Sequence, residues 1–114
     1  MGKRARAREI GIKIGLMNPG RYNAITDVDG VGVGHSTIIE GEGPLRVGRG
    51  PIRTGVTAIV PHQGDIYEEK VRAAVYPYNA YGKAVGLLQL AHMGVIETPI
   101  LLTDTLNTWI AADA

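Results

Sequence analysis

The sequence predicts a single α/β domain, and three observations support this fold class. Several stretches alternate apolar and polar residues as strands do, and others space their apolar residues as helices do. Glycines and prolines, 16 and 6 in number, separate these stretches. The length of 114 residues suits one domain and is too short for two of ordinary size. The predicted order is three strands, a helix, a strand and a helix, with helices covering the sheet.

The first part of the chain is predicted to be a short helix followed by an irregular segment. Residues 3–10 have helical character, and Gly11 is a common left-handed residue at a helix end. Residues 12–27 contain Asn-Pro-Gly and Tyr-Asn, which are turn signals. We expect this segment to be extended and irregular.

The stretch DVDGVGVGH, residues 27–35, places three glycines at alternate positions after two aspartates. A dinucleotide-binding G-x-G-x-x-G would need its third glycine where His35 or Thr37 stands. A calcium-binding EF-hand loop would need ligands where Val31 and Ile38 stand. Neither functional interpretation fits this stretch.

The remaining interpretation of this stretch is structural. Asp29–Gly30 forms a turn, and residues 31–40 continue as a strand. Within that strand, Gly32 and Gly34 would let another layer of the protein approach closely.

The middle of the chain is predicted to contain a hairpin and a third strand. Residues 41–53 are rich in glycine and proline and form a long hairpin loop. A second strand covers residues 54–61, which its final proline ends, and residues 62–70 are a polar connection. A third strand covers residues 71–82, where Pro77 requires an edge position or a bulge.

The last part of the chain is predicted to be helix, strand and helix. Residues 84–94 have helical spacing and end at Gly94. Residues 98–105 form a continuous apolar run of strand length, which predicts burial on both faces. Residues 106–114 begin a helix that no glycine or proline ends. We therefore expect a chain that has been cut short and that exposes a large apolar face by itself.

Composition excludes several classes of function. The formal net charge of +1 gives no reason to expect nucleic acid or an anionic membrane as a partner, and the basic residues 2–8 suit a solvated or interface helix. The absence of cysteine excludes disulfides, thiolate metal sites and a cysteine nucleophile. Because the chain has neither an apolar run of the ~20 residues that span a bilayer nor a signal-peptide pattern, we expect the cytoplasm.

Few residues suggest chemistry by their spacing. The three histidines, 35, 62 and 92, lack the short spacings of a zinc site, so no metal is expected. Tyr76, Tyr78 and Tyr81 either stack on a substrate or pack across strands, and Tyr81 is the better candidate for substrate contact. These patterns indicate an α/β domain without a complete active site.

Four segments in a fixed order resemble the DmpA-type aminopeptidases, also called L-aminopeptidase/D-esterase or β-peptidyl aminopeptidase proteins. They are NAITDVDGVGVGHSTII, GPIRTGVTAIVP, YNAYGKAVGLLQL and ETPILLTDTLN. Each segment alone is weak, but their order makes the resemblance specific. It covers the chain from about Arg4 onward.

The resemblance implies a fold and a chemistry. Members are N-terminal-nucleophile hydrolases with a four-layer α-β-β-α sandwich, and they assemble as homo-oligomers without a metal or cofactor. The precursor cuts itself before a serine or threonine, whose freed amine then acts as base for its hydroxyl. Their substrates are short peptides, amides or esters. Residues 1–114 would then be the N-terminal third of one hydrolase domain, partnered by the remainder of the polypeptide, with no catalytic residue in this chain.

The resemblance also implies substrate-binding residues, namely Asn79, Tyr81, Lys83 and Asp104. Lys83 stands where peptidase members commonly have a glutamate that holds the substrate's ammonium group, and a lysine would repel that group. Asp104 stands where the family usually has asparagine. A buried carboxylate there needs a partner, and Lys83 is a candidate. The alternative function is a non-enzymatic scaffold or binding domain that reuses the same fold.

Overall fold

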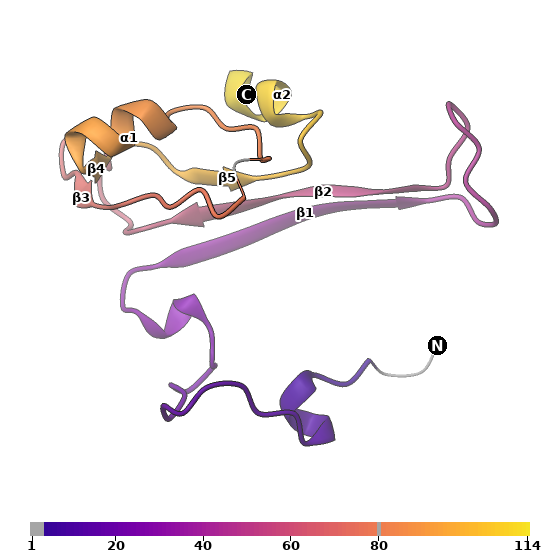
Figure 1. Ribbon diagram of the computed structural model, residues 1–114, viewed down its shortest axis with the longest axis horizontal. Helices are drawn as coiled ribbons and strands as arrows, with labels where there is room; N and C mark the ends of the chain where they lie inside the picture. The colour runs from indigo at the N-terminus through magenta and orange to yellow at the C-terminus, as the bar shows by residue number, and fades with distance from the viewer. Residues whose placement is uncertain (1–3, 80) are drawn as a thin grey trace.

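A long β-hairpin is the centre of the computed structural model, which describes residues 4–79 and 81–114. Strands β1 (Gly32–Glu40) and β2 (Ile52–Val60) pair antiparallel along their whole length. Strand β5 (Ile100–Leu102) pairs antiparallel with the other edge of β2, which gives the sheet order β1-β2-β5 (Figure 1). The predicted turn at Asp29–Gly30, the hairpin loop and the first two strands are confirmed.

The remaining elements lie around this sheet. Strands β3 (Val71–Arg72) and β4 (Val95–Ile96) form a separate two-stranded sheet, with helix α1 (Leu87–Met93) between them in sequence. Helix α2 (Thr108–Asp113) follows β5 and contacts it. The helices predicted at residues 84–94 and 106–114 are confirmed, and Gly94 ends α1 with a φ of 67°.

The N-terminal segment runs on the opposite side of the hairpin from the two helices (Figure 1). It contains two short 3₁₀ helices, η1 (Ala7–Ile10) and η2 (Ile25–Asp27), in an otherwise irregular path. Gly11 follows η1 with a φ of 85°, as predicted. The predicted helix is therefore a single 3₁₀ turn among the described residues, and its start at residue 3 lies outside them.

Asp27 organises the irregular segment that precedes β1. Its Oδ1 accepts the backbone N–H of Tyr22 at 2.8 Å, and its Oδ2 accepts that of Ala24 at 3.1 Å. These backbone donors hold the pKa of Asp27 below its ordinary value. A Cβ at Gly20 would lie 2.6 Å from Asp27 Cγ, so the clasped loop requires glycine there.

The structure contradicts the predicted third strand. Only Val71 and Arg72 are strand residues, and residues 73–79 are irregular. Pro77 lacks the backbone N–H that a ladder needs, so the tyrosine-rich stretch around it has no sheet to join. Residue 80 lies outside the described residues.

The structure also contradicts the predicted burial of the run at residues 98–105. Its strand, β5, has three residues and forms an edge of the sheet. Ile100 and Leu102 are 40% and 53% exposed, because the apolar run has one strand beside it and one short helix against it. A continuous apolar run shows that a segment needs cover on both faces, and the described residues supply only part of that cover.

The predicted close approach at Gly34 is absent from the described part of the chain. No atom lies within 4 Å of the position of a Gly34 Cβ, and at Gly32 the nearest atom is the Gln63 Nε2 at 3.2 Å. Backbone atoms instead lie very close to Gly55, where a Cβ would overlap the Ser36 carbonyl oxygen.

Among the described residues there is no buried core. The Cα radius of gyration is 17.4 Å, whereas a compact domain of this length has about 13 Å. The predicted exposed apolar surface is confirmed, and it spreads over the N-terminal segment, the hairpin and both helices. None of the helices in the described residues is both long and apolar enough to cross a bilayer.

Candidate functional site

Three of the predicted substrate-binding residues lie in the loop that leads into α1. The backbone N–H of Tyr81 donates to Asn79 Oδ1 at 3.2 Å. The Lys83 Nζ lies 5.6 Å from the centre of the Tyr81 ring, within the range of a cation–π contact. The ring is 82% exposed, so this local cluster can reach a ligand. The alternative of cross-strand tyrosine packing is wrong, since neither residues 73–79 nor residues 81–83 form a strand.

The fourth predicted residue, Asp104, holds the turn between β5 and α2. Its Oδ1 accepts the backbone N–H groups of Leu106 at 3.0 Å and Asn107 at 3.2 Å. Its Oδ2 accepts the Asn107 side-chain amide at 2.6 Å. The Asn107 side chain, followed by the Leu106 backbone, holds the pKa of Asp104 below its ordinary value.

This geometry corrects the expected environment of Asp104. The carboxylate is exposed rather than buried, and its partner is Asn107. No hydrogen bond or ion pair joins Asp104 to Lys83, both of which the structure describes. An aspartate readily accepts the N–H groups two and three residues ahead of it, and this local bonding satisfies the carboxylate without a distant cation.

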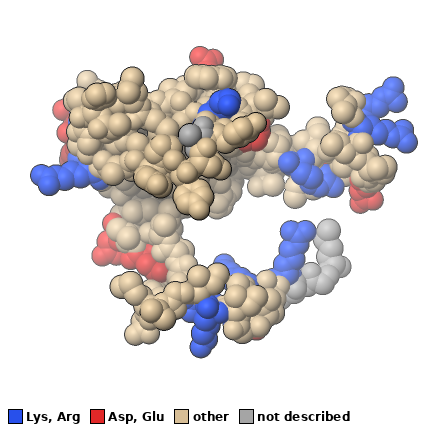
Figure 2. Space-filling model, viewed as in Figure 1, with Lys and Arg blue, Asp and Glu red and all other residues tan. Residues whose placement is uncertain are grey.

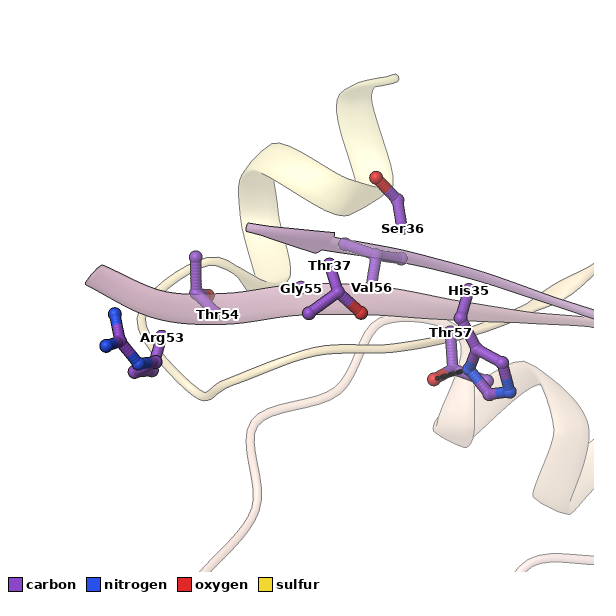
Figure 3. A pocket seen from close by; sticks show the side chains of 8 residues that line it. All are labelled: His35, Ser36, Thr37, Arg53, Thr54, Gly55, Val56 and Thr57. Carbon is purple, nitrogen blue, oxygen red and sulfur yellow. Dashed lines mark hydrogen bonds between the residues drawn. The ribbon is translucent and has the colours of Figure 1, made fainter. Parts of the chain in front are cut away.

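A hollow on the β1–β2 hairpin brings together residues that their sequence spacing did not single out (Figure 3). Figure 3 shows Ser36 pointing toward helix α2, with His35, Thr37 and Thr57 on the opposite face of the ribbon. The complete lining is His35, Ser36, Thr37, Arg53, Thr54, Gly55, Val56 and Thr57. The β1 residues and the β2 residues of this lining lie beside each other because of the hairpin register. The sequence did not determine that register, since a long glycine-rich loop separates the two strands.

The chemistry available in this hollow is polar and incomplete. His35 Nδ1 lies 2.9 Å from Thr57 Oγ1, the separation that a base and a hydroxyl nucleophile require. In the described residues, however, no third group bonds the other ring nitrogen of His35 to orient it. The Arg53 guanidinium donates to the carbonyls of Glu40 and Gly41 and is thereby occupied. The hollow can hydrogen-bond a polar group but lacks the parts of a catalytic triad.

The polar connection between β2 and β3 is held by internal bonds. His62 Nδ1 accepts the Gly64 N–H at 3.1 Å, so its Nε2 is the nitrogen that donates to the Glu69 carbonyl at 2.8 Å. Lys70 pairs with Glu97 at 3.6 Å, and Glu97 also accepts the Gln89 side-chain amide at 2.6 Å. Lys70, the last residue of the predicted polar connection, therefore ties this connection to the α1–β4 region.

Comparison with known proteins places this chain in a family. Residues 23–114 match peptidase family S58. The β-peptidyl aminopeptidase BapA of Sphingosinicella microcystinivorans is 41% identical over 109 residues, covering 96% of this chain and 27% of BapA.

Solved structures agree with the sequence match. The PH0078 protein from Pyrococcus horikoshii OT3 has a TM-score of 0.87 and 57% identity, covering 96% of this chain and 31% of that one. The L-aminopeptidase D-Ala-esterase/amidase from Ochrobactrum anthropi, described as a variant of the Ntn hydrolase fold, has a TM-score of 0.71 and 42% identity. That match covers 90% of this chain and 28% of the Ochrobactrum chain.

The chain spans about a quarter of the length of the curated relatives that it matches. The match to the family covers most of the chain and includes the hairpin, the loop before α1 and the turn before α2. It confirms the resemblance noted in the sequence. The chain therefore belongs to peptidase family S58.

Proposed function

We propose that this chain is the N-terminal portion of a self-processing serine-type aminopeptidase or amidase that acts on short peptides, amides or esters. The observation that carries the proposal is the identity of 41% over 109 residues to a protein named as a β-peptidyl aminopeptidase. The nucleophile would lie downstream of residue 114. The described residues hold no complete set of base, nucleophile and orienting group, which agrees with that placement.

The exposed apolar surface supports a larger fold around this segment. Both the hairpin and β5 leave apolar side chains uncovered, and α2 covers only part of the sheet. A sheet of this kind needs a second layer on its free face. The proposed fold of the whole protein is the four-layer α-β-β-α sandwich, completed by the rest of the polypeptide and assembled into a homo-oligomer.

The loop before α1 is the proposed contact with the amino end of the substrate. Asn79, Tyr81 and Lys83 lie within one loop, and the Lys83 ammonium is exposed. A positive charge there disfavours a substrate with a free ammonium group and favours a carboxylate or amide oxygen, because lysine only donates hydrogen bonds. Asp104, also proposed to lie beside this site, would act through the shape of its turn, since Asn107 already occupies its carboxylate.

Intact-mass spectrometry of the natural gene product, combined with a peptide-amide hydrolysis assay, tests the proposal. The expected result is two chains, the second of which begins with serine or threonine, and hydrolysis that substitution of that residue abolishes. A single unprocessed chain without hydrolysis would support the alternative, a scaffold or binding domain with the same fold.

A further inference from the structure

We propose that the tip of the β1–β2 hairpin binds the acidic turn of a second copy of the protein. The hairpin tip is residues 44–50, and the acidic turn is residues 65–69. This inference assigns an interaction surface and a partner, and it does not depend on the proposed hydrolase chemistry.

The hairpin tip stands away from the rest of the chain. Figure 1 shows the loop at the far end of β1 and β2, with no other element of the described chain around it. Leu45 and Val47 at the tip are 75% and 98% exposed. Arginine is enriched among the energetically important residues of protein interfaces, and the exposed Leu45 and Val47 add apolar area that a partner can cover.

The tip is shaped by its own hydrogen bonds. The Arg46 N–H donates to the Gly50 carbonyl at 2.8 Å, and the Arg49 N–H donates to the Arg46 carbonyl at 2.9 Å. At the neck of the loop, the Arg53 guanidinium donates to the carbonyls of Glu40 and Gly41, both at 2.9 Å. A loop that is ordered before binding loses less conformational entropy when it binds.

The charge of the tip selects an acidic partner. Arg46 and Arg49 carry two positive charges, and residues 44–50 contain no acidic residue. Neither guanidinium has a hydrogen bond or ion pair within the described chain. Both arginines flank a hollow at the base of the loop that Glu42 also lines, and Figure 2 shows more basic than acidic surface at this end of the molecule. Arginine beside a hollow suits a carboxylate, which it can bind through two parallel hydrogen bonds.

The acidic turn offers such carboxylates. Asp65, Glu68 and Glu69 are exposed, and the stretch 65–69 contains no basic residue. Asp65 shapes the turn by accepting the Tyr67 and Glu68 N–H groups. In the described chain, Glu68 and Glu69 form no ion pair. The ammonium of Lys70, which follows, donates to the Tyr67 carbonyl of the turn and pairs with Glu97, so the acidic side chains of residues 65–69 still outnumber the cation beside them.

The strand geometry makes this contact intermolecular. The tip precedes Ile52 and the acidic turn follows Val60, so the two lie beyond opposite ends of β2. A nine-residue strand separates its ends by roughly 30 Å, and the paired ribbon cannot fold back on itself. Two copies related by a two-fold axis, with their hairpins antiparallel, place each tip beside the other copy's acidic turn. The contact then forms twice.

Charge reversal in separate copies tests this contact in the natural polypeptide. One variant carries Arg46→Glu and Arg49→Glu, and the other carries Glu68→Arg and Glu69→Arg. Each variant alone places like charges at both contacts, so its dissociation constant should rise at least about tenfold. A mixture of the two should restore association as a heterodimer, because opposite charges then meet at both contacts. Native mass spectrometry resolves the three species.

Two further measurements separate folding from binding. Arg46→Lys with Arg49→Lys keeps the charge and should assemble nearly as the parent does. A photo-crosslinking amino acid at Val47 of the otherwise unchanged protein should attach to residues 65–69 of another molecule, as mixed isotope labelling shows. Unchanged assembly of the reversed variants, or failure of the mixture to associate, would overturn the proposal. Cross-links confined to one molecule or directed to other residues would also overturn it.

Discussion

Asp27 and Asp104 show how single carboxylates organise the irregular parts of this chain. Each binds backbone N–H groups a few residues away and thereby fixes a turn next to a sheet strand. Both residues lie within the stretch that matches the family. At Asp104 the sequence suggested a ligand-binding carboxylate, but sequence alone does not show whether a turn or a distant cation satisfies it.

The Asp27 clasp should weaken in acid. Its folded-state pKa lies below the ordinary value of 3.8, so its stabilising effect is present above pH 3.8 and is lost as the pH falls through the lowered pKa. We expect the amides of Tyr22 and Ala24 to exchange faster in that range and in Asp27→Asn at neutral pH. Asp29→Asn is the matched control and should leave both amides unchanged. Equal exchange in all three proteins would contradict the clasp.

Two glycines in the hairpin should respond differently to an added methyl group. Gly55→Ala should destabilise the whole protein by about 1–3 kcal/mol, because its Cβ would overlap the Ser36 carbonyl. Gly34→Ala should change the free energy of unfolding by less than about 0.5 kcal/mol, because that position is open. Chemical denaturation measures both. An equal cost at Gly34 would mean that another layer of the protein packs closely against it, as the sequence alone suggested.

In the proposed aminopeptidase, Lys83 should control which substrates are preferred. Lys83→Glu replaces a repelling charge with an attracting one, so the ratio of kcat/KM for substrates with a free ammonium group over those without should rise by about tenfold or more. Lys83→Arg keeps the positive charge and should preserve the preference. Unchanged selectivity in Lys83→Glu would remove this residue from the substrate site.

At the scale of the elements, local sequence signals correctly predicted where helices end and which segments form the paired strands β1 and β2. Gly11 and Gly94 adopt the left-handed conformation expected after a helix. The alternating residues of β1 and β2 form paired strands, because each supplies the other's hydrogen bonds. A helix end depends on its sequence neighbours, and the alternation of each strand lies within that strand, so local sequence patterns contain these features.

The incorrectly predicted elements depend on residues that are distant in sequence. The tyrosine-rich stretch around Pro77 has strand-like composition but no adjacent strand to pair with. The polar hollow with His35 and Thr57 arises from a register across an eleven-residue loop, residues 41–51. Its hydroxyl residues are ordinary strand residues when each strand is read alone. Only the assembled hairpin shows that His35, Thr37 and Thr57 share one face.

A side-chain hydrogen bond should anchor the short strand β5. The Thr103 hydroxyl donates to the Gly55 carbonyl at 3.2 Å, just beyond the three residues that pair with β2. Thr103→Val should lower the free energy of unfolding by about 1 kcal/mol and speed amide exchange in β5. Thr103→Ser keeps the hydroxyl and should behave like the parent in exchange. Equal exchange in the valine variant would show that backbone pairing alone holds β5.

At the scale of the whole molecule, residues 4–79 and 81–114 lack the burial of apolar side chains that a stable fold needs. None of the described side chains is fully buried, although the net stability of a domain derives largely from burying apolar surface. The elements agree with family relatives at TM-scores of 0.71–0.87, so their arrangement suits a larger protein. The hairpin, β5 and α2 therefore match one part of those longer solved structures.

The isolated segment should accordingly associate and be inactive. Its exposed apolar side chains favour contact with copies of itself, and its described residues contain no complete nucleophilic site. Sedimentation velocity should show an oligomer or aggregate, a dye that binds apolar surface should fluoresce strongly, and peptide-amide hydrolysis should stay at background. Adding the downstream part of the natural polypeptide should reduce the dye signal, because that part would cover the free sheet face. A monomer with measurable turnover would contradict both the exposed-surface argument and the downstream location of the nucleophile.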